Sequence, residues 1–224
     1  MKSNEKGFTL VEIAIVLVII GLLLGGILKG QEMITQAKIK NAVADFSGIS
    51  AAYYGYQDRY RAIPGDDPNA ATRWSGAAIS STAGEAGNGV VSGAYNATCP
   101  TVAAGTAAES CLWWDDLRRA GFVSGNGAQQ PFNAFAGIIG VQTGSNGGTP
   151  PTALGGFAGL IVCSANIPDK VAIALDTQMD DGKIATGTVR GQLQTATNPA
   201  INTSADSTEY AETGTNLYVI CKQI

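Results

Sequence analysis

The candidate chemical side chains of this sequence are carboxylates and cysteines, and its 224 residues include no histidine. The absence of histidine excludes Ser-His-Asp and Cys-His catalysis, HExxH zinc sites and histidine-ligated metals. The sequence contains no P-loop and no GxGxxG motif after an expected strand. The net charge is −4 and no cluster of Lys or Arg occurs, so we expect no nucleic-acid partner. We therefore predict that the chain is not an enzyme and uses no cofactor.

Three carboxylates have a spacing that suits a calcium ion. Asp176, Asp180 and Asp181 precede Gly182 in the run LDTQMDDGK. Carboxylate and carbonyl oxygens around such a turn are ligands that Ca²⁺ accepts, but the run lacks the D-x-D-x-D-G spacing and the closing Glu of an EF-hand loop. The alternative is an ordinary Asp-Asp-Gly turn after a helix. We favour the turn and keep these three residues as weak calcium candidates.

A further carboxylate, Glu12, lies inside the most apolar segment. Residues 8–28, FTLVEIAIVLVIIGLLLGGIL, are apolar except for Thr9 and Glu12. As a helix this run spans about 31 Å, which matches a bilayer core of roughly 30 Å. Lys2 and Lys6 precede it, and no A-x-A cleavage site follows it. We expect the segment to cross the membrane with its short N-terminal side in the cytoplasm and the rest of the chain outside.

The position of Glu12 requires a partner. A carboxylate in a membrane helix is costly unless it is paired, and no cation within the same segment can reach it. Either a neighbouring chain supplies the partner, or the carboxylate sits near the headgroups and is partly hydrated. The second possibility makes Glu12 a residue that is merely tolerated at the interface, and we favour the first.

The run KGFTLVE at residues 6–12, followed by the apolar segment, resembles the N-terminus of type IV prepilins and type II secretion pseudopilins. In that family a membrane-embedded prepilin peptidase cuts after the Gly and methylates the new N-terminal Phe with S-adenosylmethionine. The resemblance implies cleavage between Gly7 and Phe8, methylation of Phe8 and assembly through Glu12. It covers residues 5–60 well and becomes looser beyond them.

The resemblance implies a structural subunit, a pilin or minor pilin of a type IV pilus-like filament or a subunit of a secretion pseudopilus. Its implied partners are the prepilin peptidase/N-methyltransferase, other pilin subunits and the inner membrane. Before assembly the chain would cross the inner membrane once, with its head in the periplasm, and the filament would carry that head at the cell surface. The alternative is a membrane-anchored extracytoplasmic binding protein or enzyme whose anchor stays uncleaved.

The four cysteines all lie in the part of the chain expected outside the cytoplasm. An even number of cysteines in an oxidising compartment suggests two disulfides, with three possible connectivities. We favour Cys99–Cys111, which joins a loop to a short helix, and Cys163–Cys221, which joins two expected strands. Cysteine-ligated zinc is the alternative, and the lack of any CxxC pair disfavours it.

One long helix must position the N-terminal residues. After the apolar run, residues such as Ile39, Val43 and Phe46 recur at three- and four-residue spacing, so the helix continues to about residue 60 with one apolar face. The breaker PGDDP then ends it. The expected parts of the chain are a leader at 1–7, a transmembrane or filament-core helix at 8–30, its amphipathic continuation at 31–62, and a head at 63–224 with a variable loop at about 75–109.

The head is expected to contain two short helices and an antiparallel sheet, which makes the fold α+β. A helix follows Ser110 as its N-cap and ends at Gly121, and its Trp113 and Trp114 are favoured as core residues over a carbohydrate platform. Apolar alternation bounded by turn residues predicts strands, and a second helix begins with Pro168 in its first turn. The strands are predicted at 134–141, 157–163, 184–194 and 217–222, and the second helix at 167–179.

Overall fold

The structure is a computed structural model that describes residues 9–80, 85–144, 153–204 and 209–224. The chain separates into two compact units, residues 1–38 and residues 39–224, and each unit is described by itself. Helix α1, Leu10–Tyr60, contributes residues to both units. The prediction of a long N-terminal helix that continues to about residue 60 is therefore confirmed.

Among its described residues, the second unit combines short helices with a four-stranded antiparallel sheet, which confirms the predicted α+β class. The strands pair in the order β1-β2-β4-β3. Each predicted strand corresponds to one of them, although the ends differ by a few residues. The elements are α2 (Ala70–Arg73), α3 (Glu109–Arg119), β1 (Ile139–Thr143), β2 (Leu160–Pro168), α4 (Asp169–Met179), β3 (Val189–Leu193) and β4 (Leu217–Gln223).

Alternate residues of each strand point to opposite sides of the sheet, and both of these faces are buried. Val162 of β2 and Ile220 of β4 belong to a core that includes residues of α1 and α4. Their neighbours Cys163 and Cys221 belong to a second core on the other face. Burial on both faces explains why the start of β2, Leu160–Cys163, is a continuous apolar run without alternation.

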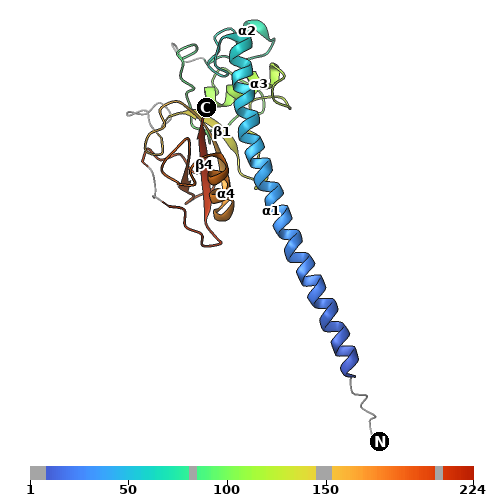
Figure 1. Ribbon diagram of the computed structural model, residues 1–224. Helices are drawn as coiled ribbons and strands as arrows, with labels where there is room; N and C mark the ends of the chain where they lie inside the picture. Colours follow the sequence, from blue (N-terminus) through green and yellow to red (C-terminus); the bar gives the residue numbers. More distant parts are fainter. Residues whose placement is uncertain (1–8, 81–84, 145–152, 205–208) are drawn as a thin grey trace, which may run out of the picture. The chain divides into compact units, whose positions relative to one another are not determined.

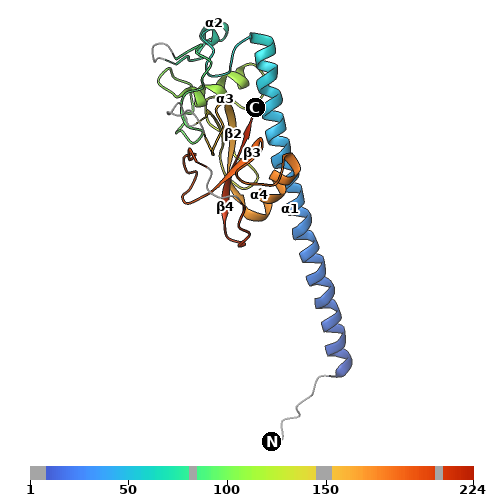
Figure 2. The ribbon, with the colours of Figure 1, turned by 60° about the vertical axis from the view of Figure 1, so that its left-hand side comes forward.

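The second half of α1 lies along one face of the sheet (Figures 1 and 2). A single stripe of its side chains belongs to the core on that face. Helix α4 contributes to the same core, beside that half of α1. The stripe recurs every three or four residues, as an amphipathic helix requires. Its buried members are Ile39, Ala42, Phe46, Ile49, Ala52, Tyr53 and Tyr56.

The ends of the short helices differ from the sequence prediction. Helix α3 begins at Glu109, so Ser110 is not its N-cap but lies in its first turn. Ser110 is buried and its hydroxyl donates to the Ala94 carbonyl (3.1 Å), which leaves it no role in capping. Helix α4 begins at Asp169, and Pro168 is the residue that precedes it. The short helix α2 was not predicted, because four residues are too few to show a period.

Candidate functional site

The start of α1 carries a closed set of hydrogen bonds between Thr9 and Glu12. The Thr9 backbone N–H donates to Glu12 Oε2 (2.9 Å), and the Thr9 hydroxyl donates to the same oxygen (2.8 Å). In return the Glu12 backbone N–H donates to Thr9 Oγ1 (3.3 Å). Because Thr9 directly precedes the first helical residue and Glu12 is the third, the pair forms a capping box.

This capping box changes the interpretation of Glu12. The sequence argument seeks the partner of Glu12 in another chain or in headgroup water, whereas the structure supplies two donors from Thr9 within the same segment. Both donors are uncharged, so they satisfy one carboxylate oxygen without neutralising its charge. The T-x-x-E pattern at residues 9–12 is the sequence signal for the box, and a search for cations alone overlooks it.

The other two residues of the predicted processing site are Gly7 and Phe8. Both lie outside the described residues, so the structure does not place them relative to Glu12. The part of the site that the structure describes therefore consists of Thr9, Glu12 and the apolar helix that follows them.

That apolar helix leaves its large side chains uncovered within its own unit. The apolar side chains in this part of α1 are exposed by fractions that range from 46% at Ile20 to 90% at Leu10. Helix α1 is long and apolar enough to cross a membrane, by length and composition. An apolar surface of this size needs a second apolar environment, either lipid or other helices.

The four cysteines form two disulfides, and these are the pairs favoured from the sequence. Cys99 is bonded to Cys111, which ties the long loop to α3. Cys163 is bonded to Cys221, and these residues stand directly opposite each other on β2 and β4. Both members of the second pair are fully buried in the core on the sheet face away from α1. No described cysteine is free.

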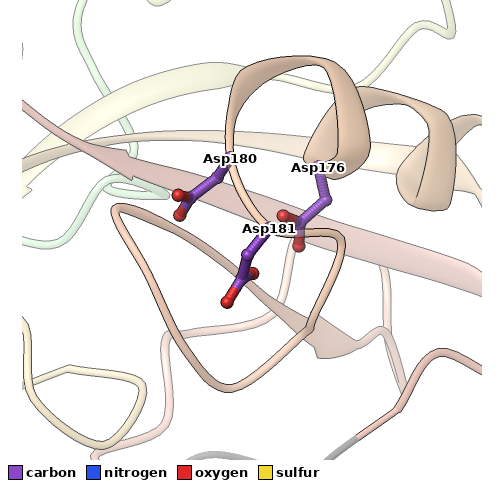
Figure 3. Close-up of side chains that lie close together, drawn as sticks. All are labelled: Asp176, Asp180 and Asp181. Carbon is purple, nitrogen blue, oxygen red and sulfur yellow. The ribbon is translucent and has the colours of Figure 1, made fainter.

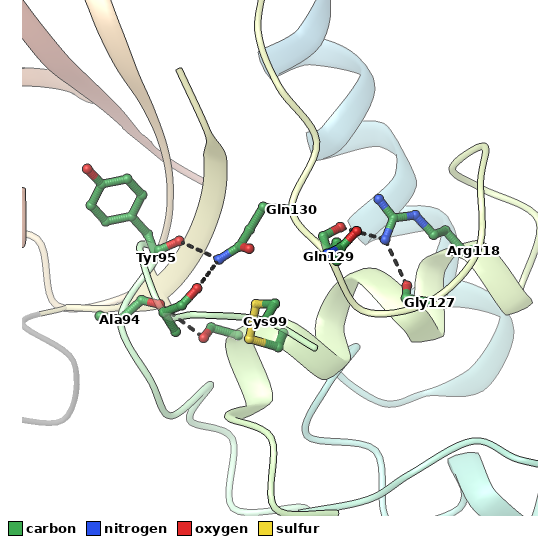
Figure 4. The surroundings of a disulfide bond; sticks show 10 residues. Ala94, Tyr95, Cys99, Arg118, Gly127, Gln129 and Gln130 are labelled. Atoms are coloured by element: carbon green, nitrogen blue, oxygen red, sulfur yellow. Dashed lines mark hydrogen bonds between the residues drawn. A yellow bond between two sulfur atoms is a disulfide. The ribbon is translucent and has the colours of Figure 1, made fainter. Parts of the chain in front are cut away.

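Hydrogen bonds fix the chain on both sides of the Cys99–Cys111 bond (Figure 4). The Gln130 side-chain amide donates to the Tyr95 carbonyl (3.2 Å). Arg118 Nη1 donates to the carbonyls of Gly127 (2.8 Å) and Gln129 (2.7 Å) in the loop after α3. The disulfide and these bonds hold an irregular region that has few apolar residues to bury.

The three calcium candidates converge at the turn after α4 (Figure 3). Asp176, Asp180 and Asp181 each bring a carboxylate oxygen within 4.8 Å of the others. Asp176 is fully buried and accepts the Tyr210 hydroxyl (2.6 Å) and the Gly182 N–H (3.1 Å). Burial raises the pKa of Asp176 to about 6, and the two neighbouring carboxylates add to the shift.

The other two carboxylates of this cluster also have partners in the chain. Asp180 accepts the backbone N–H of Thr188 and that of Val189 (2.9 Å). The Val189 N–H belongs to β3 but is not hydrogen-bonded to β4, so Asp180 supplies its acceptor. Asp181 accepts the Lys183 N–H (3.0 Å) and the Thr186 hydroxyl (2.5 Å). These contacts give the three carboxylates a structural role in the turn between α4 and β3.

The aromatic residues of α3 lie in the core. Trp113 and Trp114 are fully buried, so neither offers a face to a sugar. Phe122, which follows the helix, packs its ring on α1 at Gly55. A Cβ at that glycine would lie 2.8 Å from the ring, so any other residue at this position near the end of α1 would displace the ring.

The described residues also line a cavity of about 310 Å³ at the end of α1, between Tyr60 and Gly89. Among the described lining residues Asp66 supplies the one carboxylate, which accepts the backbone N–H groups of Gly87, Asn88 and Gly89. Its described lining contains no serine, cysteine or lysine.

Comparison with known families finds a match for the N-terminal residues. Residues 2–28 match the model of the prokaryotic N-terminal methylation motif, which confirms the resemblance to the signal of type IV prepilins and pseudopilins. The match includes Gly7, Phe8, Thr9 and Glu12 and ends before the head. Neither the curated proteins nor the solved structures contain a match to the chain.

Proposed function

We propose that this chain is a structural subunit, a pilin or minor pilin, of a type IV pilus-like filament. The observation that carries this proposal is the methylation motif at residues 2–28, which marks the chain as a type IV pilin-like precursor. The uncovered apolar helix that follows supports it, because a filament core is one environment that buries such a helix. The head contributes structure rather than catalysis.

The first step of the proposed function is processing at the cytoplasmic face of the inner membrane. A prepilin peptidase cleaves between Gly7 and Phe8, and its methyltransferase activity methylates the new Phe8 amine. Gly7 has no side chain, so the chain can lie extended in a protease cleft. The methylated amine keeps its positive charge.

The second step is assembly, in which the carboxylate of Glu12 meets the charged amine of another chain. Thr9 already holds the Glu12 carboxylate at the N-terminal end of the helix, where the helix dipole favours negative charge. An incoming Phe8 ammonium then supplies the charge that the hydroxyl and amide of Thr9 lack. Because an unpaired carboxylate is costly in an apolar core, this pairing selects the correct register.

The two disulfides suit a head that functions outside the cytoplasm, in the periplasm before assembly and on the filament surface afterwards. One disulfide links the long loop to α3, and the other links β2 to β4. The head then keeps its fold under conditions in which chaperones do not act on it.

Mass spectrometry of the N-terminus tests this function. Protein is recovered from membranes and from filaments sheared off the cell surface, and its N-terminal peptide and unreduced intact mass are measured. We expect the sheared fraction to begin at methylated Phe8 and to lack the mass of four thiol hydrogens. A chain that keeps Met1 and occurs only in membranes would contradict the proposal and make the segment an uncleaved anchor.

A further inference from the structure

Carboxylates are buried around α3 to an unusual degree. Asp66 and Asp67, which precede α2, and Glu109, Asp115 and Asp116 of α3 each expose 3% of their surface or less. Buried carboxylates in proteins are normally paired with cations or supplied with several hydrogen bonds. Four of them come from two pairs of adjacent acids, and their partners differ sharply.

Three of these carboxylates are matched by a cation or by several hydrogen-bond donors. Asp66 accepts three backbone N–H groups from the loop at residues 87–89. Asp67 forms an ion pair with Arg73 and accepts the Tyr56 hydroxyl (2.7 Å). Asp115 forms an ion pair with Arg119 (2.6 Å).

Asp116 and Glu109 differ from these three, because one oxygen of each is buried without a hydrogen-bond partner. Glu109 Oε2 accepts the Ser92 N–H (2.9 Å), whereas Asp116 Oδ2 accepts the backbone N–H of Gly65 (2.7 Å). Gly65 belongs to the segment between α1 and α2, residues 61–69, which we name the strap. The strap crosses α3 closely, because a Cβ at Gly65 would lie 2.3 Å from the Glu109 carbonyl oxygen. The strap therefore covers Asp116 and excludes water from it.

The charges that face Asp116 balance only when Asp116 is neutral. From α3 it faces Asp115 and Arg119, and from α2 it faces Arg73. Arg73 in turn is paired with Asp67 at the end of the strap, so two carboxylates match two guanidinium groups. The phenol of Tyr56 in α1 also lies close to Asp116. An ionised Asp116 adds an unmatched negative charge under the strap.

We propose that Asp116 is a proton-operated latch: its neutral carboxyl keeps the strap closed over α3, and loss of its proton loosens the strap. Burial, together with the neighbouring Asp115, raises the pKa of Asp116 to about 7 against the opposing effects of Gly65, Arg73 and Arg119. The proton leaves for solvent when the strap opens and returns when it closes. The latch thus responds between weakly acidic and neutral pH.

Hydrogen–deuterium exchange on the full disulfide-bonded chain in detergent micelles tests the latch. Rates are corrected for the intrinsic pH dependence of exchange, and the strap is compared with β2 and β4. We expect protection of the strap to fall by about tenfold or more between pH 5.5 and pH 8, as an acid with a raised pKa in the closed state requires. At each pH the strap should exchange faster than the strands, because it opens without unfolding of the sheet. Constant strap protection, or strap exchange that occurs only at the rate of the strands, would overturn the proposal.

Two variants separate the latch from a general effect of buried acids. Asp116→Asn keeps the shape and the acceptor for Gly65 but cannot ionise, so its strap should stay protected at pH 8. Asp176→Asn removes another buried acid, under α4, and should leave the pH response of the strap intact. A pH response that persists in Asp116→Asn contradicts the latch.

The wild-type chain gives an independent readout if Asp116→Asn does not fold. A carbon-detected NMR titration follows the side-chain carboxyl of Asp116 directly. We expect a midpoint near neutral pH, accompanied by a shift of the Gly65 amide signal with the same midpoint. An Asp116 midpoint at the ordinary value for aspartate, about 4, would overturn the proposal.

Discussion

The two halves of helix α1 are both rich in apolar residues, but they differ in what covers them. In the half before residue 39, Leu17 and Leu23 expose 64% and 60% of their surface. In the half after it, Phe46 and Tyr56 expose 2% and 0% because the head of the same chain packs on them. From Ile13 to Leu28 the first half is apolar on all sides, whereas the second half carries one apolar stripe.

This difference shows that one continuous helix serves two purposes. The second half derives its stability from packing within its own unit, as most helices of globular proteins do. The first half buries nothing within its own unit, so it needs lipid or other helices as an apolar environment. Substitutions in the two halves should therefore affect different measurements, assembly for the first and head stability for the second.

The largest effect is expected at Glu12. Glu12→Val keeps the first half apolar and removes the carboxylate, so processing after Gly7 should continue while incorporation into filaments falls to background. Immunoblots of membrane and sheared fractions measure both. Glu32→Gln is the matched control, because Glu32 lies in the same half, 60% exposed and paired with Lys29. Filaments that contain normal amounts of Glu12→Val would contradict the pairing role.

A core substitution in the second half should destabilise the head strongly. Phe46→Ala is expected to lower the free energy of unfolding by about 3–5 kcal/mol, because it removes a buried ring and leaves a cavity. Leu17→Ala in the first half should leave that free energy unchanged. Urea denaturation followed by fluorescence of the buried tryptophans compares the two variants. Equal effects at both positions would show that the halves do not differ as described.

Removal of a disulfide should have the next largest effect on the head. Replacing both Cys163 and Cys221 with alanine should cost about 2–5 kcal/mol, since this bond closes the longer loop. The residues it joins are 58 apart in sequence, against 12 for the Cys99–Cys111 bond. Replacing Cys99 and Cys111 with alanine should therefore lower the stability of the head by less. Melting temperatures under non-reducing conditions give the order. A larger loss of stability on removal of the Cys99–Cys111 bond would contradict this order.

The head should be more stable at weakly acidic than at neutral pH. Folding raises the pKa of Asp116 to about 7 and that of Asp176 to about 6, so the folded head binds more protons than the unfolded chain. The stability that these groups contribute is complete below the unfolded pKa of about 4 and is lost as pH rises toward 7. Scanning calorimetry at pH 5.5 and pH 8 should show the higher melting temperature at pH 5.5, and Asp116→Asn should narrow the gap.

The smallest effect is expected from the capping box. Thr9→Val removes the hydroxyl and should cost about 0.5–2 kcal/mol of helix stability at the start of α1, without preventing processing. Thr9→Ser keeps the hydroxyl and is the control. A quantitative pull-down of filaments that contain both variant and wild-type subunits measures how much of the variant is incorporated. Thr9→Val that is excluded as completely as Glu12→Val would show that the box is needed for assembly itself.

Much of the fold was accessible from sequence because its signals are local. The three- and four-residue spacing in α1 and the turn residues around the strands each lie within a short window. The start of β1 was predicted at 134 rather than 139, an error matched at the start of β3, which was predicted at 184 rather than 189. Before β1, the buried Asn133 accepts the N–H groups of Phe135 and Gly137, which bends residues 134–138 into a turn despite their apolar pattern.

The sequence by itself determined the type IV pilin-like signal, because residues 2–28 carry it in their order and in their apolar length. It also contained the T-x-x-E box, for which neighbours in sequence suffice. Only the tertiary structure decided which carboxylates are buried and which of them have partners. Asp116 meets Gly65 from 51 residues away, and its charge depends on Arg73 and Arg119 packed around it. Such an environment depends on long-range packing, and no local pattern of residues encodes it.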